Sequence, residues 1–223
     1  MLSKKEFDVV LALHAGSVSN QRSLANETGL SLGSVNATLK KLASKGLVQG
    51  YELTSEGCDV LASHKVDNAV ILAAGLSSRF APISYEKPKG ILQVRDEVLI
   101  ERQIRQLKEA GIDDITVVVG YKKEYFFYLE DALGVSIVVN EEYASRNNHS
   151  SLMVVRDRLK NTYICSSDDY FVENPFEPYV WKAYYAAQYV EGPTREWCIG
   201  VGSGDRITSV EIGGSDAWVM IGH

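Results

Sequence analysis

The chain has 223 residues, of which 45% are hydrophobic and 23% charged, a composition typical of globular proteins and not of collagens, disordered tails or disulfide scaffolds. No apolar run approaches the ~20 residues that span a bilayer, and the first residues lack the apolar core of a signal peptide. We therefore expect a cytoplasmic protein without membrane association. The three cysteines have no paired spacing, so they indicate neither a disulfide framework nor a zinc site.

The charge balance changes near residue 65. Residues 1–65 carry seven basic and six acidic side chains, whereas the rest of the chain carries 16 basic and 23 acidic ones. A change of this kind favours two domains with different roles, which we place at 1–65 and 66–223.

The first domain is predicted to be helical with a hairpin near its end. Apolar residues at helical spacing predict helices over 3–15, 20–29 and 31–45, and an alternating stretch around a glycine predicts a hairpin over 47–54. This pattern, with Leu53-Thr54-Ser55-Glu56-Gly57 opening a closing helix, resembles a winged helix-turn-helix domain.

The resemblance implies a third helix that faces DNA, with four candidate contact residues: Ser34, Asn36, Lys40 and Lys41. A net charge of +1 is small for neutralising phosphates. A role in dimerisation, giving a homodimer, or in regulation therefore stays open beside DNA binding, because a fold alone does not decide function.

The second domain is predicted to alternate strands and helices. The strands are expected at 69–72, 115–119, 135–139 and 162–165, and the helices at 98–111, 123–132 and 150–159. Such alternation predicts βαβ units around a parallel sheet, whose ligand sites lie at the carboxyl ends of the strands. The apolar run 218–223 reads as one more core strand.

The loop after the first of these strands is built from small residues. Ala73, Ala74, Gly75, Ser77 and Ser78 allow backbone N–H groups to come close to a polyphosphate. Arg79 and Lys89 add two cations, which suit a leaving pyrophosphate. The loop is neither a Walker A loop nor a Gly-x-Gly-x-x-Gly dinucleotide loop, and the missing glycine pattern argues against a Rossmann-type oxidoreductase.

Leu72-Ala73-Ala74-Gly75, Arg79 and Pro88-Lys89 together resemble the signature of sugar-phosphate and related nucleotidyltransferases. That resemblance implies an α/β fold, in which the winged helix-turn-helix domain precedes a Rossmann-like three-layer α/β/α nucleotidyltransferase domain with a mostly parallel sheet. It also implies catalytic roles for Arg79 and Lys89. The family's second glycine is replaced here by Ser77, and its lysine is followed by Gly90-Ile91, which are mild departures.

The later loops extend the likeness. The segment from Asn140 through Tyr143 to Asn147-Asn148 and Ser151-Leu152 is similar to one in bacterial choline-phosphate cytidylyltransferases. Paired amides offer the donors and acceptors that reading a pyrimidine edge requires, although Asn148 alternatively caps the following helix. The nucleotide-binding residues that we expect are Leu72, Ala73, Ala74, Gly75, Leu76, Ser77, Ser78, Gly120, Tyr121, Asn147, Asn148 and Ser151.

The end of the fourth strand carries Asp168, at the position where the family binds catalytic Mg²⁺ through an aspartate. Asp169, beside it, has at most a supporting role. The family also continues past the strand at 218–223 to a second acidic metal ligand, which no residue here matches. We therefore expect an incomplete transferase domain in a fragment of a longer protein, with that ligand beyond His223.

The acceptor is predicted from aromatic residues, because a quaternary ammonium group is best recognised by aromatic faces. Tyr189, Glu196 and Trp197 lie in a pattern similar to that of the choline relatives. The favoured function is Mg²⁺-dependent transfer from an NTP, best CTP, to a phosphorylated small molecule, best phosphocholine, with release of pyrophosphate. Two alternatives remain: a sugar 1-phosphate acceptor, and a metabolite-sensing DNA-binding transcription regulator with a catalytically weak transferase-like domain.

Overall fold

The computed structural model describes residues 1–146 and 148–221, apart from the side chain of Arg79. The chain forms two compact units. The first contains residues 1–66 and also 177–183, and the second contains 67–176 and the segment from 184 onward. The first boundary lies one residue from the one expected. Residues 177–183, here called the strap, lie within the range 66–223 expected for the second domain but pack with the first unit.

The first unit has the expected winged helix-turn-helix elements: α1 (Lys4–His14), α2 (Gln21–Thr28), α3 (Leu32–Ser44), β1 (Val48–Gln49), β2 (Glu52–Leu53) and α4 (Ser55–Ala62). Side chains of Ser3, Asn20, Ser31 and Thr54 accept hydrogen bonds from the first turns of the four helices, which is why each helix begins where it does. Gly57 lies against the hairpin, since a Cβ there would stand 2.1 Å from the carbonyl oxygen of Leu47.

The strap completes the apolar core of this unit. Tyr179 and Trp181 pack against a core that includes the fully buried Leu24, Val35 and Leu42. The Trp181 indole Nε1 donates to the carbonyl of Leu2 at 2.9 Å. A segment far along the sequence therefore belongs to the winged-helix core.

The second unit is built on a four-stranded sheet with the order β7 (Ser136–Val139), β6 (Ile115–Val119), β3 (Asn68–Ala73), β8 (Thr162–Ser166). All of its neighbouring strands are parallel, as expected. The chain moves outward from β3 to β6 and β7 and then returns to the other side of β3 as β8. The topological switch point, where such sheets bind ligands, therefore lies between β3 and β8.

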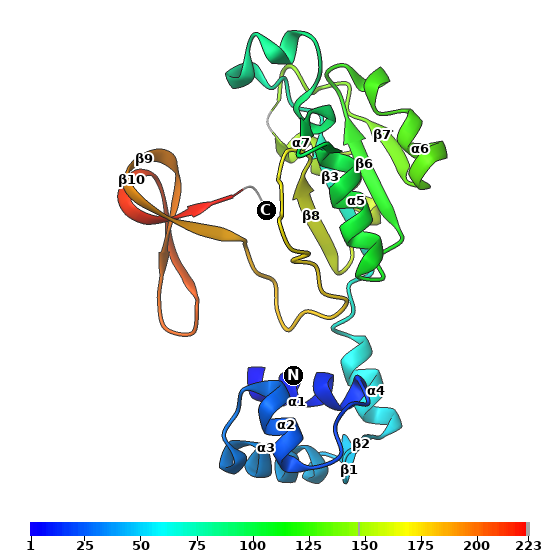
Figure 1. Cartoon of the computed structure of the whole chain (residues 1–223), viewed down its shortest axis with the longest axis vertical. Helices are drawn as coiled ribbons and strands as arrows, with labels where there is room; N and C mark the ends of the chain where they lie inside the picture. The colour runs from blue at the N-terminus through cyan, green and yellow to red at the C-terminus, as the bar shows by residue number, and fades with distance from the viewer. Residues whose placement is uncertain (147, 222–223) are drawn as a thin grey trace. The chain divides into compact units, whose positions relative to one another are not determined.

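Helices cover the sheet as the three-layer prediction requires. Leu152, in α7 (Asn148–Met153), and Val155, just after it, pack against Val70 and Val118 on one face of the sheet. The helix α5 (Leu99–Glu109), which buries Ile100, Ile104 and Leu107, runs along the sheet in Figure 1.

Two predicted helices are shorter than expected. The one expected at 123–132 is a 3₁₀ turn (Lys123–Tyr125) followed by α6 (Tyr128–Leu133), and the one at 150–159 begins earlier and ends in a 3₁₀ turn (Arg156–Arg158).

The C-terminal part differs most from expectation. Residues 218–220 end a long strand, β10 (Ile207–Met220), which pairs with β9 (Ala187–Val201) in a separate antiparallel sheet and not in the central one. This ribbon curls back on itself (Figure 1), because Trp218 pairs with both Tyr189 and Ile199. A short hairpin, β4 (Gln93–Val94) and β5 (Glu97–Val98), precedes α5. None of the helices in the described residues has the length and apolar character needed to cross a membrane.

Candidate active site

The loop after β3 opens to solvent directly beyond the sheet. Ala74 is buried, whereas Gly75, Leu76 and Ser78 are exposed. Ser77 has φ 52° and ψ 29°, in the left-handed region, and is followed by a 3₁₀ turn (Ser78–Phe80). This conformation favours glycine, so the serine here carries a local backbone cost. Residues 75–78 are the part of the predicted phosphate-binding loop that lies beyond the buried backbone, and we call them the cradle. Leu72 and Ala73 belong to β3.

A second loop, after β6, is joined to this one. The Tyr121 amide donates to the carbonyl of Ala74 at 3.2 Å, and its hydroxyl donates to the carbonyl of Ser84 at 3.3 Å. A Cβ at Gly120 would stand 2.7 Å from the Tyr143 Cβ and 2.9 Å from the Ala74 oxygen. Glycine at position 120 therefore allows three loops to meet at the sheet edge.

The end of β8 closes the other side of the site. The Ser167 amide donates to the Leu72 carbonyl at 3.2 Å, and a Cβ on Gly90 would stand 2.9 Å from the Ser167 Cβ. Beside this contact the Lys89 Nζ lies 3.0 Å from the Asp168 Oδ2, with 24% and 35% of the two side chains exposed. The structure thus brings together Lys89 and Asp168, which the sequence analysis selected separately. The Lys89 ammonium also lies 5.5 Å from the centre of the Phe80 ring.

The strand that leads to Asp168 carries a buried cysteine, Cys165. Burial raises the pKa of the Cys165 thiol, and the nearby charge of Asp169 raises it further. A buried neutral thiol is a poor nucleophile and a poor metal ligand. Cys165 is therefore a packing residue, and the polar chemistry of this edge rests on the residues that follow β8.

The residues expected to bind the nucleotide base differ in their exposure, and one of them lies outside the described residues. Asn147 and the Arg79 side chain lie outside the described residues. Asn148 is exposed at the first residue of α7. Ser151 is buried, and its hydroxyl accepts a hydrogen bond at 3.0 Å from the Asn140 Nδ2, which also donates to Ser150. This bonding gives Ser151 a part in ordering the turn. Asn140 was not selected, although its place at the end of β7 was a signal.

The expected acceptor residues all lie on β9. Tyr189 and Trp197 are about half exposed, and Glu196 is exposed as well. The ring of Tyr189 meets Trp218 edge-on at 5.6 Å, an aromatic contact that the sequence analysis did not select. Trp197 pairs with Ile212 across the ribbon.

The donor chemistry at the end of β8 fits a hard cation. No three His, Cys, Asp or Glu side chains of the described chain gather around one point, so the site offers no all-protein cage. Mg²⁺, however, is commonly held by one or two carboxylates, with substrate phosphates and water completing its shell. The partly exposed carboxylate of Asp168, beside a lysine and the open loop, fits a metal held in this way.

On the winged helix, three of the four candidate DNA contacts have partners within the unit. Lys41 pairs with Glu6 at 3.2 Å, and the Asn36 side-chain amide donates a hydrogen bond to the Gln21 side chain at 3.4 Å. Ser34 accepts a hydrogen bond from the Ser31 hydroxyl. Lys40 is exposed. The positive charge on α3 therefore lies on Lys40 and on Lys41, whose side chain stays 60% exposed beside Glu6.

Glu6 is the buried centre of this ion-pair group. Burial opposes its ionisation, but hydrogen bonds from Lys45, Ser3 and Lys41 prevail and lower its pKa to about 2. The Lys45 Nζ lies 2.6 Å from the carboxylate. This charge therefore ties α1 to the end of α3.

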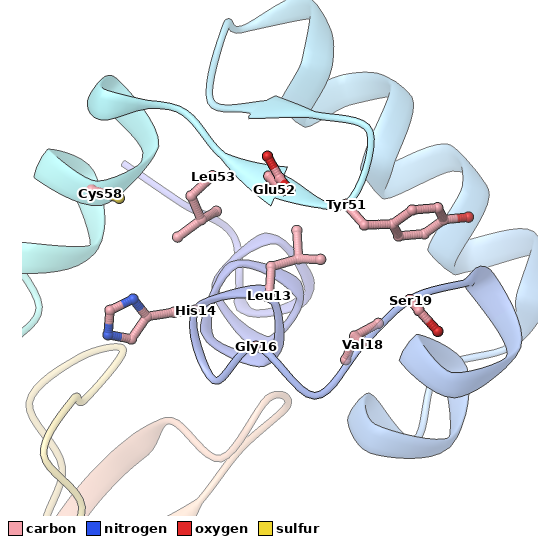
Figure 2. A pocket seen from close by; sticks show the side chains of 9 residues that line it. All are labelled: Leu13, His14, Gly16, Val18, Ser19, Tyr51, Glu52, Leu53 and Cys58. Carbon is pink, nitrogen blue, oxygen red and sulfur yellow. The ribbon is translucent and has the colours of Figure 1, made fainter.

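A hollow of about 480 Å³ also lies in the winged-helix unit (Figure 2). Its lining residues are Leu13, His14, Gly16, Val18, Ser19, Tyr51, Glu52, Leu53 and Cys58. None of the candidate catalytic, nucleotide-binding, acceptor-binding, metal-binding or DNA-binding residues lines it.

Comparisons with known proteins agree with this geometry. Residues 69–190 match the MobA-like NTP transferase domain, and residues 2–49 match a winged helix-turn-helix DNA-binding domain. Choline-phosphate cytidylyltransferase of Streptococcus pneumoniae is 38% identical over 69% of this chain and 67% of its own length. A 2-aminoethylphosphonate cytidylyltransferase of Lancefieldella rimae is 38% identical over 70% of this chain and 65% of its own length.

A solved structure of the Streptococcus pneumoniae CTP:phosphocholine cytidylyltransferase superposes with a TM-score of 0.67, covering 70% of this chain and 68% of that one. A Bacillus anthracis structure described as a putative glucose-1-phosphate thymidylyltransferase shares the fold at 21% identity, with a TM-score of 0.58. The chain spans about two thirds of the length of the two curated relatives. It belongs to the MobA-like NTP transferase family and carries a winged helix-turn-helix domain before the transferase domain.

Proposed function

We propose that this protein transfers a cytidylyl group from CTP to a small phosphorylated or phosphonylated amine, best phosphocholine, with release of pyrophosphate. The observation that carries the proposal is the Lys89–Asp168 pair at the switch point, beside the exposed loop 75–78. The names of the two most similar curated relatives mentioned above support the choice of CTP and of an aminated acceptor.

The reaction needs little acid–base chemistry. A phosphate or phosphonate oxygen of the acceptor attacks the α-phosphorus of the nucleotide, a new P–O bond forms, and the bond to the β-phosphate oxygen breaks. The attacking oxygen is already anionic near neutral pH, so catalysis consists mainly of positioning and charge neutralisation. Mg²⁺ bound at Asp168 would polarise the α-phosphate.

The chain's own residues have distinct tasks in this scheme. Backbone N–H groups of 75–78 bind the phosphates, because Gly75, Ser77 and Ser78 are small enough to let them come close. The Lys89 ammonium, held at the sheet edge by Asp168, neutralises charge between the α-phosphate and the incoming anion. We assign to Arg79 the binding of the leaving pyrophosphate, on the basis of its place in the sequence alone.

The acceptor site is proposed on β9. Tyr189 and Trp197 present exposed aromatic faces, to which a cationic headgroup binds without hydrogen bonds. Glu196 adds a negative charge on the same strand. A sugar 1-phosphate would need polar side chains that reach several hydroxyls. An experiment has to distinguish this alternative acceptor from the aminated one.

The test is pyrophosphate release with each of four NTPs and Mg²⁺, using phosphocholine, 2-aminoethylphosphonate or glucose 1-phosphate as acceptor. The expected result is turnover with CTP and an aminated acceptor. Preference for glucose 1-phosphate would select the alternative acceptor, and no turnover on any combination, with CTP binding also absent, would refute the proposal. Calorimetry of CTP binding, with and without Mg²⁺, supplies the second measurement.

A second candidate function follows from the match of residues 2–49 to DNA-binding domains. In it the winged helix binds an operator, and the transferase unit reports a metabolite. Fluorescence anisotropy with duplex DNA at several salt concentrations, with and without CTP, tests this role. Elution mass measured by light scattering tests the expected homodimer.

A further inference from the structure

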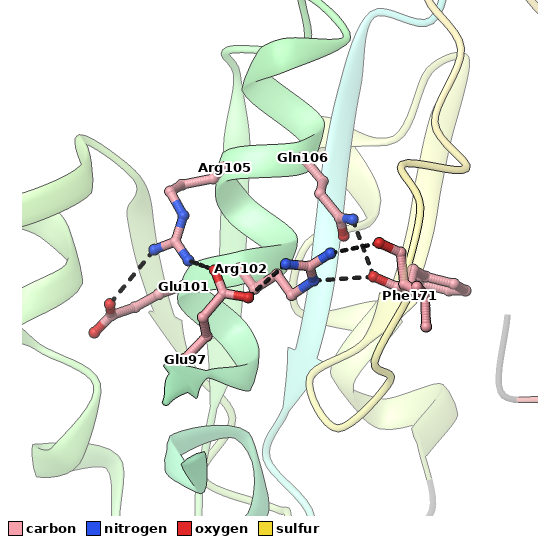
Figure 3. A network of polar contacts seen from close by, with 7 residues as sticks. Glu97, Glu101, Arg102, Arg105, Gln106 and Phe171 are labelled. Carbon is pink, nitrogen blue, oxygen red and sulfur yellow. Dashed lines mark hydrogen bonds and ion pairs between the residues drawn. The ribbon is translucent and has the colours of Figure 1, made fainter. Parts of the chain in front are cut away.

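The loop that follows Asp168 is held to α5 through its backbone. Arg102 donates from Nε to the carbonyl of Phe171 at 2.9 Å and from Nη2 to the carbonyl of Val172 at 2.7 Å (Figure 3). Both acceptors are main-chain oxygens. The contact therefore fixes the path of the chain at this point whatever side chains the loop carries.

Arg102 is itself held in place. Its Nη1 pairs with the Glu97 carboxylate, and its guanidinium lies 4.8 Å from the centre of the Tyr170 ring. The hydrogen bond from Arg102 is the main reason that the pKa of Glu97 is lowered, so Glu97 is charged near neutral pH. Only 20% of the arginine side chain is exposed. The fork therefore has little freedom to swing away from the two carbonyls.

Two amides add to the same attachment. The Gln106 Nε2 donates to the Phe171 carbonyl at 3.1 Å, as Figure 3 shows. The Asn174 Nδ2 donates to the Gln106 carbonyl at 2.7 Å. The loop from 170 to 174 is thus bonded to one face of α5 at successive points.

The other end of the same loop is also held. Ser167 is bonded to the Leu72 carbonyl and packs against Gly90, where no Cβ fits. Asp168 and Asp169 therefore lie in a three-residue segment, 168–170, between the attachments at Ser167 and Phe171. Because carboxylate direction follows backbone direction over so short a span, moving either attachment turns the Asp168 carboxylate.

We propose that Arg102 is a positioning residue, which orients Asp168 toward the metal-bound nucleotide by holding the carbonyls of 171 and 172. The inference rests on the proposed function. Arginine suits this task because its planar fork reaches both carbonyls and Glu97 at once, whereas a lysine ammonium is a compact group on a flexible stem. Residues that orient metal ligands through hydrogen bonds typically contribute about 10- to 100-fold to metal affinity or activity.

The experiment compares Arg102→Lys and Arg102→Ala with Arg105→Ala in the 223-residue chain. Arg105 is a matched control, because it pairs with the same Glu97 carboxylate at 2.7 Å and with Glu101 at 3.8 Å, on the helix side of the network. Losing it leaves the Arg102 bonds to the loop in place. Far-UV circular dichroism and urea unfolding establish that each variant folds.

The readout is Mn²⁺ binding in the presence of CTP, measured as loss of the free-ion signal in electron paramagnetic resonance, beside the kcat and KM of pyrophosphate release. For both Arg102 variants we expect the half-saturating Mn²⁺ concentration to rise about tenfold or more, with metal-free CTP binding unchanged. Arg105→Ala should stay within about twofold of the wild type.

A wild-type Mn²⁺ requirement in a folded Arg102→Ala, or an equal loss in Arg105→Ala, would overturn the inference while leaving the proposed function intact. If Arg102→Ala does not fold, Arg102→Lys decides alone. If the wild-type chain neither binds CTP nor releases pyrophosphate, the proposed function fails, and this role of Arg102 fails with it.

Discussion

The ammonium of Lys89 lies 3.0 Å from the carboxylate of Asp168, although the two residues are 79 positions apart in the chain. One follows β3 and the other follows β8, and these strands are neighbours at the switch point of the sheet. In the proposed reaction this pair supplies a cation for phosphate and an oxygen ligand for a metal at the same edge, next to the loop 73–78. Nucleotidyl transfer needs both charges at one place.

Replacing Lys89 by alanine is expected to reduce turnover at least about a hundredfold, which is comparable to losing one preorganised charge contact in the transition state. The measurement is kcat for pyrophosphate release at saturating CTP. Lys87→Ala is the control, because this neighbouring lysine is exposed and should retain near-normal turnover. Near-normal turnover in Lys89→Ala would remove the assignment.

Two glycines of the site should respond differently to alanine. Gly120→Ala forces a methyl group against Tyr143 and the Ala74 oxygen, so the free energy of unfolding of the transferase unit should fall by about 2 kcal/mol. Gly75→Ala meets no atom within 4 Å and should leave stability unchanged while weakening CTP binding. Urea unfolding and calorimetry separate the two effects. Equal stability losses would contradict the description of the cradle.

Ser77 is a position where glycine should be better than the native residue. Its left-handed backbone costs a serine about 1 kcal/mol, so Ser77→Gly is expected to stabilise the transferase unit by about 0.5–1 kcal/mol, and Ser77→Val to destabilise it. Ser78→Gly is the control and should be slightly destabilising, since Ser78 begins a 3₁₀ turn. Chemical denaturation gives the order, and a destabilising Ser77→Gly would show that the strain is absent.

The winged-helix unit should lose stability in acid through Glu6. Because its pKa is lowered to about 2 from 4.5, the unfolded chain binds the proton first. The stabilisation is fully present above about pH 4.5, and it is lost as the pH falls toward 2. Its size is about 3 kcal/mol at most.

Glu6→Gln should remove this pH dependence and lower protection of the α1 and α3 amides at pH 7. Hydrogen exchange at several pH values makes the measurement. Asp8→Asn, which breaks an ion pair with a largely exposed lysine, should have a small effect. A pH profile of Glu6→Gln that still falls between pH 4.5 and 2 like the wild type would contradict this account.

Much of the fold could be read from the sequence because its signals are local. The run 115–119 is apolar and rich in β-branched residues, and β6 has the predicted bounds. The caps at Asn20 and Ser31 act over three residues, so the starts of α2 and α3 were also readable. Strand and helix alternation then implied the parallel sheet, and with it the edge that carries the site.

The expected strand at 218–223 shows where such reading stops. An apolar run predicts a strand but not its partner; here residues 218–220 pair with β9 in a separate ribbon, and 222–223 lie outside the described residues. In the same way, the roles of Ser151 and Asn140 depend on how the turn between them folds. The place of the strap depends on the packing of Tyr179 and Trp181 in another unit.

The sequence by itself determined the order of the main helices and strands from α1 to β8, the small-residue loop 73–78 and the charged residues near it, since these follow from propensity, capping and spacing within a few residues. Only the tertiary structure decided that Lys89 meets Asp168, and that Arg102 holds the carbonyls of 171 and 172. Those contacts join residues about 70–80 positions apart. Their existence depends on strand order and register, which local interactions do not specify.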